Sequence, residues 1–187
     1  MKKTILLMAL LCLSAIGIFA QGSPNFSGNW TLDKSKSKLP ENSRIESMTI
    51  KATQTAGDLT VETATKREPR PEGAGGGMGG QGGGGGRGMG GGMMGGDGTS
   101  VFKLDGSETT TEVETRMGKM PVKSKATLSA SGLETMTSRT FNTPNGEMTM
   151  TTKENWTLAD GGKTLKIVRT STSPRGDTTS EMVFTKN

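Results

Sequence analysis

The sequence predicts an all-β fold, an antiparallel meander of about eight to ten strands that closes into a barrel. Apolar and polar residues alternate with a period of two in successive runs, which is typical of strands with one wet face. Short turn sequences separate these runs, such as "TPNGE" at 143–147 and "ADGGK" at 159–163. Asn-Gly and Asp-Gly supply the positive φ angles of tight hairpins, so consecutive strands are expected to pair antiparallel.

Ten segments carry the alternation or lie between successive turns. Val122, Ser124 and Ala126, for example, alternate with two lysines and a threonine. Threonine, which occurs 27 times after position 20, is β-branched and suits a half-buried pleated surface. No segment after the first 20 residues has convincing helical periodicity. We expect strands near residues 28–33, 45–54, 58–66, 99–104, 107–117, 120–130, 132–142, 147–158, 163–172 and 178–186.

Residues 21–187 are predicted to form one domain. Residues 21–66 offer only the first three expected strands and few large apolar side chains, which is too little to fold alone. A meander of this length must also hide its edge strands, and closure into a barrel does so.

A glycine-rich stretch at residues 67–98 interrupts this domain. Residues 73–98 hold 18 of the 29 glycines, and glycine has no side chain to pack and the most backbone freedom to lose. We therefore expect a flexible loop between the third and fourth strands. Its four methionines are either soft ligands for copper(I) or incidental to the low complexity. Because no histidine or cysteine reinforces them, we predict no metal site.

The first 20 residues are typical of a secretory signal peptide. Lys2 and Lys3 precede an apolar run from Ile5 to Phe19, and Ala20 provides a small residue for cleavage. The run is short for a membrane span, and an uncleaved anchor is the alternative interpretation. We expect an exported protein, in the periplasm or outside the cell, with no membrane span after cleavage.

The residue types that are missing narrow the function. The chain has no histidine and no tyrosine, and its single cysteine, Cys12, leaves with the signal peptide. Triads and most zinc, iron and copper sites need these side chains. Without Lys2 and Lys3 there are 21 Lys and Arg against 18 Asp and Glu, too small an excess to argue for nucleic acid. We predict no enzyme, no cofactor and no nucleic-acid partner; chemistry by paired carboxylates is the remaining enzymatic alternative.

Four motifs make the chain resemble a family of secreted, uncharacterised bacterial lipocalin-like proteins. They are the Gly-x-Trp motif of "FSGNWTLD" at 26–33, "FKLDGSE" at 102–108, "WTLADGGKTL" at 156–165 and "VFTK" at 183–186. In lipocalins the first-strand tryptophan packs across the closed end of the barrel. The resemblance therefore implies a calycin-type barrel in which Gly28 and Trp30 are structural. Lipocalins carry a partner arginine on the last strand, where this chain offers only Lys186.

The two tryptophans occur in the same tetrapeptide, "NWTL", at 29–32 and 155–158. The flanking sequences differ, so the repeat is not a duplicated module. Each copy places an indole and a leucine on the inner face of a strand. Because barrel closure brings the ends of the meander together, Trp30 and Trp156 are expected to share one core.

Candidate ligand-binding residues lie on the stripe that contains Trp156. Indole supplies a large apolar face and one hydrogen-bond donor, although a plain core tryptophan is the competing interpretation. An inward glutamate, Glu154, is the candidate polar anchor and would need a partner such as Arg139 or Arg169. The candidate cavity residues are Met148, Met150, Glu154 and Trp156.

The small inward residues point to a binding protein. Threonine, serine and alanine underfill a barrel, which leaves either a flattened barrel or a cavity with polar walls. The leading hypothesis is an exported, non-enzymatic protein that holds a small apolar or amphipathic molecule, with the open end and the glycine-rich loop controlling access. The alternative is a structural or interaction protein of the cell envelope with a filled barrel and no small-molecule ligand.

Overall fold

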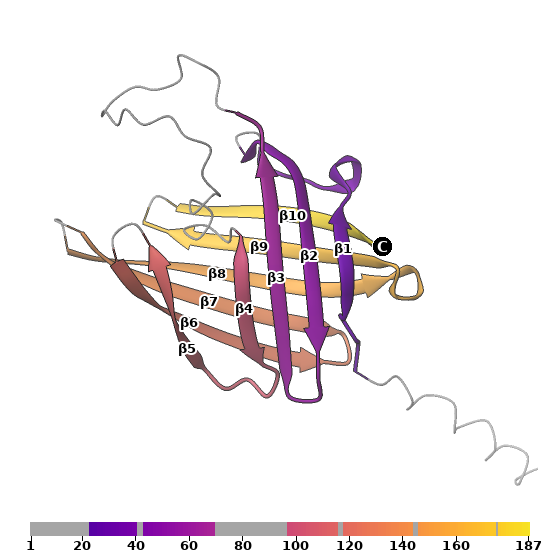
Figure 1. The fold of residues 1–187 in the computed structure, drawn as a ribbon, viewed down its shortest axis with the longest axis horizontal. Helices are drawn as coiled ribbons and strands as arrows, with labels where there is room; N and C mark the ends of the chain where they lie inside the picture. Colours follow the sequence, from indigo (N-terminus) through magenta and orange to yellow (C-terminus); the bar gives the residue numbers. More distant parts are fainter. Residues whose placement is uncertain (1–22, 41–42, 70–96, 116–117, 144–145, 175) are drawn as a thin grey trace, which may run out of the picture.

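A single ten-stranded antiparallel sheet forms a nearly closed barrel (Figure 1). The structure is a computed structural model that describes residues 23–40, 43–69, 97–115, 118–143, 146–174 and 176–187. The predicted signal peptide and residues 70–96 of the predicted glycine-rich loop lie outside these ranges.

The strands match the predicted segments closely. β3 extends through Arg67 and β4 begins at Gly98, so the two end residues of the predicted loop belong to strands. The bounds are β1 Gly28–Leu32, β2 Ile45–Gln54, β3 Asp58–Arg67, β4 Gly98–Lys103, β5 Thr109–Thr115, β6 Gly118–Ser129, β7 Gly132–Thr143, β8 Gly146–Ala159, β9 Thr164–Ser173 and β10 Gly176–Lys186.

The fifth strand is shorter than predicted because a side-chain turn precedes it. Asp105 Oδ1 accepts hydrogen bonds from the backbone N–H of Ser107, at 2.9 Å, and from its hydroxyl, at 2.7 Å. An aspartate that binds the backbone two residues on favours a turn over a strand. β5 therefore starts at Thr109 rather than at residue 107.

The order of strands in the sheet follows the chain, with one closing pair. Strands that are consecutive in sequence pair with each other, except β4 and β5, which are left as the two edges. β1 pairs with β10. The edges approach each other at one end, where Asp105 and Thr127 form an isolated bridge and the Leu128 N–H donates to the Leu104 carbonyl at 3.4 Å. The predicted closure of the meander is thus confirmed, with a gap between β4 and β5.

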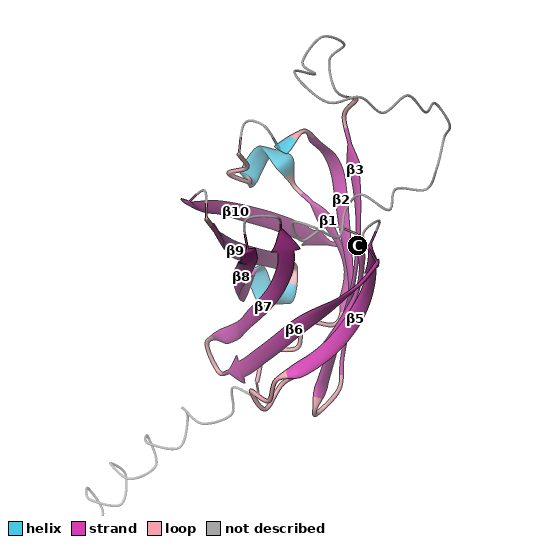
Figure 2. Ribbon diagram, turned by 90° about the vertical axis from the view of Figure 1, so that its left-hand side faces the viewer, coloured by secondary structure: helices cyan, strands magenta, loops and turns pink. Residues whose placement is uncertain are grey.

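The barrel is flattened into two crossing layers. β1–β4 run across the direction of β6–β10 (Figure 1), and from the side β2 and β3 face β8–β10 across the interior (Figure 2). Alternate residues of each strand point into this space, because successive side chains of a strand face opposite ways.

One end of the interior is a packed apolar core that contains both tryptophans, as the sequence predicts. Phe26 connects them. The Trp30 indole Nε1 donates to the Phe26 carbonyl at 3.0 Å, and the Phe26 ring meets the Trp156 ring edge to face at 5.9 Å between centroids and 83° between planes. Edge-to-face pairs add stability beyond the area they bury.

The Gly-x-Trp motif lies against the end of the last strand. Trp30 is opposite Lys186 in the β1–β10 ladder, and Lys186 Nζ stands 5.1 Å from the centroid of the Trp30 ring. Gly28 makes room for this lysine, because a Cβ atom there would lie 2.5 Å from Lys186 Cε. A cation over an indole face is attracted by the ring quadrupole, so Lys186 helps to hold β1 and β10 together.

The connection between β1 and β2 passes over the interior. It starts with a 3-10 turn, η2 Lys34–Lys36, whose first residues are capped by the Asp33 carboxylate. Lys38 then exchanges two backbone hydrogen bonds with Glu181 of β10. This pairing brings Leu39 against the core cluster and to the edge of the cavity described below. A second 3-10 turn, η4 Asp160–Gly162, joins β8 to β9. No helix among the described residues has the length and apolar character to cross a membrane.

Candidate functional site

The interior of the barrel contains a cavity of about 420 Å³ between the two layers. Pockets for small molecules fall in the range of roughly 300–1,000 Å³. The wall is made by inward residues of β2, β3 and β4 on one side and of β7–β10 on the other, with Leu39, Pro40 and Ser43 from the connection before β2. The sequence predicts either a flattened barrel or a cavity with polar walls. The structure shows both features, because the barrel is flattened and still contains a cavity with polar side chains in its wall.

The inner end of the cavity is apolar. It rests on the packed core, and the side chains there are almost fully buried. Because they alternate with outward polar residues on five strands of the two layers, an apolar floor forms without any run of hydrophobic sequence. The floor residues are Met48, Ile50, Val61, Phe102, Trp156 and Met182.

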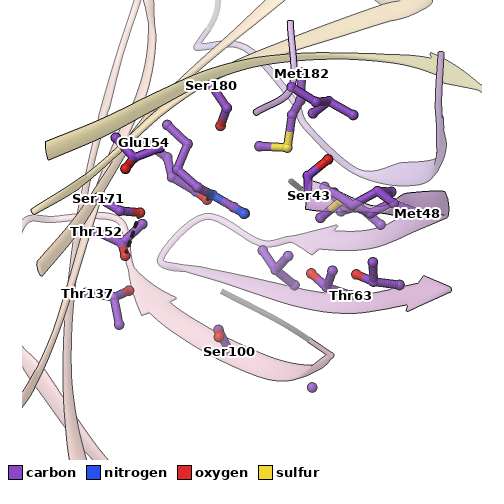
Figure 3. A pocket seen from close by; sticks show the side chains of 18 of the residues that line it. Ser43, Met48, Thr63, Ser100, Thr137, Thr152, Glu154, Ser171, Ser180 and Met182 are labelled. Carbon is purple, nitrogen blue, oxygen red and sulfur yellow. Dashed lines mark hydrogen bonds and ion pairs between the residues drawn. The ribbon is translucent and has the colours of Figure 1, made fainter. Parts of the chain in front are cut away.

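The middle of the cavity is lined by hydroxyl groups. Thr137, Thr152 and Ser171 follow one another across β7, β8 and β9, and Figure 3 shows them along one wall, with Thr63 and Met48 on the other. The hydroxyls of Thr152 and Ser171 lie 3.5 Å apart. These side chains are too small to fill the space between the layers, so the cavity remains open at this level.

Glu154, Trp156 and Arg169 form a hydrogen-bonded group beside the floor. Arg169 Nε donates to Glu154 Oε1 at 2.6 Å, and Trp156 Nε1 donates to Glu154 Oε2 at 2.9 Å. The two strands hold the pair, because Glu154 and Arg169 are direct cross-strand partners in the β8–β9 ladder. Both oxygens of the carboxylate are thus engaged by the protein, which makes Glu154 an anchor for its neighbours.

Two further arginines line the outer end, where β3 ends and β4 begins. Arg67 donates from Nη1 to the Ser43 carbonyl at 3.0 Å. Arg139 is half-buried on β7, opposite Met150, and its burial lowers the pKa of the guanidinium from the ordinary value. Within the described residues no carboxylate lies at ion-pair distance from Arg139. Among the described residues, the positive charge of Arg139 at the cavity wall therefore has no carboxylate partner.

The predicted site residues are placed in three ways. Trp156, Met150 and Glu154 line the cavity, and Trp156 also belongs to the core cluster. Met148 does not line it, because it lies two residues closer to the β7–β8 hairpin, opposite Phe141. Gly28 and Trp30 lie at the first strand, outside the wall of this cavity.

Several residues that line the cavity could not be predicted from the alternating run that contains Trp156. Met48, Ile50 and Phe102 come from the opposite layer, and period-two alternation does not say which strands face each other. The partner of Glu154 is Arg169, one of the two arginines expected from the sequence, and the other, Arg139, lies elsewhere on the wall.

The wall combines apolar, hydroxyl and guanidinium side chains. No group of three or more His, Cys, Asp or Glu side chains within the described ranges could hold a metal ion. The wall offers one apolar surface, a band of hydroxyls and a guanidinium group without a carboxylate partner, which suits a molecule with an apolar part and a polar part.

Comparison with protein-family models finds no match, and comparison with curated proteins finds none either. Among solved structures, the chain is similar to a crystal structure of zebrafish ileal bile acid-binding protein in complex with cholic acid. The two share 13% sequence identity, the match covers 87% of this chain and 98% of that chain, and the TM-score is 0.45. A similarity this distant does not indicate a ligand for the present chain.

Proposed function

We propose that the chain is an exported, non-enzymatic binding protein that holds a small amphipathic molecule in its barrel. The observation that carries the proposal is the 420 Å³ cavity, which has an apolar floor at one end and hydroxyl and guanidinium groups toward the other. A well-formed pocket with a few convergent polar groups is the usual form of a small-molecule site. The cavity favours this proposal over a filled barrel that acts only through its outer surface.

A fluorescent probe and a cavity-filling variant test the proposal. The natural chain is expected to take up N-phenyl-1-naphthylamine, an apolar dye that becomes bright out of water. Ser171→Phe, which places a ring in the cavity, should abolish uptake. Thr172→Phe places the same ring on the exposed outer face of β9 and should leave uptake unchanged. No uptake by the natural chain, or equal uptake by both variants, would contradict the proposal.

A co-purifying molecule gives independent support. Native mass spectrometry of the protein purified from its own host is expected to show a bound small molecule that Ser171→Phe lacks. Recovery of bare protein alone, together with no dye uptake, would favour the envelope interaction protein instead.

Export rests on the first 20 residues and is tested separately. The intact mass of the mature protein is expected to correspond to a chain that begins at Gln21. A mass that includes residues 1–20 would contradict cleavage and favour an uncleaved anchor.

A further inference from the structure

The wall of the cavity carries an excess of positive charge. Among the described residues, three arginines line it, Arg67, Arg139 and Arg169, against one carboxylate, Glu154. In a space with little water, a charge imbalance acts more strongly on a bound molecule than it would at the protein surface. The sign of this imbalance bears on the charge of the ligand.

The arginines differ in whether the protein already compensates them. Arg169 is neutralised by Glu154 at 2.6 Å, and Arg67 lies at the exposed end of β3, bonded to the Ser43 carbonyl. Arg139 is half-buried without a carboxylate at ion-pair distance in the part of the chain that the structure describes. Burial of a cation is costly unless it is paired, and an arginine stays charged near neutral pH even when burial opposes the charge. Arg139 is therefore the half-buried cation on this wall whose charge an anionic ligand can still pair with.

Hydroxyl groups accompany Arg139 on the same face. Thr137 lies two residues before it on β7, and Thr152 is the direct partner of Thr137 on β8. All three residues line the cavity. Threonine hydroxyls donate hydrogen bonds to anionic oxygens, and a guanidinium group binds them with two parallel N–H donors. The three side chains together offer the donors that a carboxylate, sulfonate or phosphate ester needs.

The apolar floor lies at the other end of the same wall. Arg139 is opposite Met150 of β8, and Trp156 follows six residues further along that strand, about 20 Å away at the rise of a β-strand. The cavity reaches both residues, so its two ends differ in chemistry along the direction of β8.

We infer that the ligand is a small amphipathic organic anion whose charged group binds Arg139 and whose apolar part lies on the floor over Trp156. The inference rests on the proposed function and specifies the class and orientation of the molecule. It contrasts with a neutral lipid, which would leave Arg139 uncompensated, and with the opposite orientation, which would place an anion beside Glu154.

A pair of matched dyes tests the charge. 8-Anilino-1-naphthalenesulfonate and N-phenyl-1-naphthylamine share their rings and differ by the sulfonate. The natural chain is expected to bind the sulfonate more tightly, and Arg139→Gln to weaken its binding by about tenfold or more, as loss of a charge-assisted hydrogen bond does, with little effect on the neutral dye. Arg139→Lys should keep most of the preference. Lys153→Gln removes the same charge from the exposed outer face of β8 and should change neither affinity.

Competition with decanoate, decan-1-ol and inorganic phosphate tests separately whether the ligand needs a negative charge and whether it needs an apolar part. Decanoate is expected to displace the dye better than decan-1-ol from the natural chain and no better from Arg139→Gln. Inorganic phosphate should not displace it, because phosphate has no apolar part. Displacement by phosphate alone would overturn the amphipathic part of the inference.

Brominated ligands test the orientation. Bromine quenches tryptophan fluorescence over a short range, so 10-bromodecanoate is expected to quench the natural chain more than 2-bromodecanoate does. Trp156→Phe should remove most of that difference, because the remaining Trp30 does not line this cavity. Stronger quenching by 2-bromodecanoate would overturn the orientation.

The outcomes distinguish the inference from the function beneath it. If neither dye binds the natural chain, the cavity is not a binding site and the proposed function fails. If both dyes bind equally and Arg139→Gln weakens neither, or weakens both alike while the thermal melting temperature is unchanged, the function stands and the anionic ligand is overturned. If Arg139→Gln does not fold, equal binding of the two dyes by Arg139→Lys and by the natural chain still overturns it.

Discussion

Arg169 and Glu154 form an ion pair at 2.6 Å inside the barrel, where their side chains are only 17% and 13% exposed. Removing one partner of a buried pair leaves an uncompensated charge, which costs more than the pair itself contributes. Glu154→Gln is therefore expected to lower the free energy of unfolding by about 2–4 kcal/mol, measured by urea denaturation.

The matched control replaces both partners. The double substitution Glu154→Leu with Arg169→Met removes the two charges together, and should recover most of the stability that Glu154→Gln loses. If the loss of the double variant relative to the natural chain equals the sum of the losses of Glu154→Leu and Arg169→Met measured singly, the pair does not act as a unit.

Phe26 joins the two tryptophans through its ring and its carbonyl group. Phe26→Ala removes a fully buried ring and should destabilise the protein by about 3–5 kcal/mol. Both variants keep the backbone carbonyl that accepts from Trp30. Phe26→Leu also keeps most of the apolar volume, so its loss should be clearly smaller. Each kcal/mol corresponds to a fall of about 2–4 °C in the melting temperature for a domain of this size. Equal losses for the two variants would contradict the expectation that buried apolar volume accounts for most of the effect.

Gly132 opens β7 at a place where only glycine fits. Its φ angle is +154°, and a Cβ atom there would lie 2.4 Å from the Trp156 carbonyl oxygen, a backbone atom that cannot move aside alone. Gly132→Ala should cost about 1–3 kcal/mol in thermal or urea unfolding. Gly57→Ala is the control, since nothing lies within 4 Å of a Cβ atom at that position. A loss for Gly57→Ala as large as that for Gly132→Ala would mean that the close approach to Trp156 is not the cause.

Glu181 links β10 to two lysines on neighbouring segments. A hydrogen bond from Lys166 holds the pKa of the Glu181 carboxyl below its ordinary value, and the charge of Lys38 adds to the effect. A carboxyl whose pKa is lower in the folded state stabilises above its unfolded pKa, about 4.3 for glutamate, and loses this contribution as the pH falls through the folded pKa. The natural chain should therefore be slightly more stable than Glu181→Gln at pH 7, and the difference should shrink as the pH falls below the unfolded pKa of about 4.3 and through the lower folded pKa.

The control for this pH profile is Glu134→Gln on the outer face of β7. No ion pair involves Glu134 among the residues that the structure describes, so its removal should give no such pH-dependent difference. A difference between the natural chain and Glu181→Gln that grows as the pH falls would contradict the sign of the argument. Because the group is at the surface, the effect is expected to be small.

The strands were predictable because their signal is local. Alternation in 147–158 assigns Glu154 and Trp156 to one face of a strand, and the hairpin sequences on both sides fix which strands are consecutive. Both pieces of information lie within a dozen residues of sequence. The shared core of Trp30 and Trp156 followed from closure alone, although the residue that joins them, Phe26, lies before the first strand and belongs to no alternating run.

The parts that sequence reasoning missed depend on contacts between distant segments. The gap between β4 and β5 could not be read from alternation, because period two assigns a face to each residue and leaves the neighbour of each edge strand open. Met148 fails as a cavity residue because the stripe continues past the end of the space that it borders. The β8–β9 register places Arg169 opposite Glu154, so among the described residues the charge of Arg169 is paired with a carboxylate and that of Arg139 is not. Alternation within single strands does not give this register.

The strand order has a consequence for how the chain could be rewired. Among the strands that the structure describes, only the β1–β10 ladder joins two that are not consecutive in the chain. The N–H of Asn187 donates to the Asn29 carbonyl at 2.9 Å, so Asn187 lies beside the first strand. A circular permutant that links the end of β10 to the start of β1 and opens between Ser107 and Glu108 would cut no ladder. Its chain order would then equal the spatial order, from β5 through β10 and β1 to β4. Every pairing of the barrel sheet would then join strands that are consecutive in the chain, and the lower contact order of such a chain favours faster folding than that of the natural connectivity.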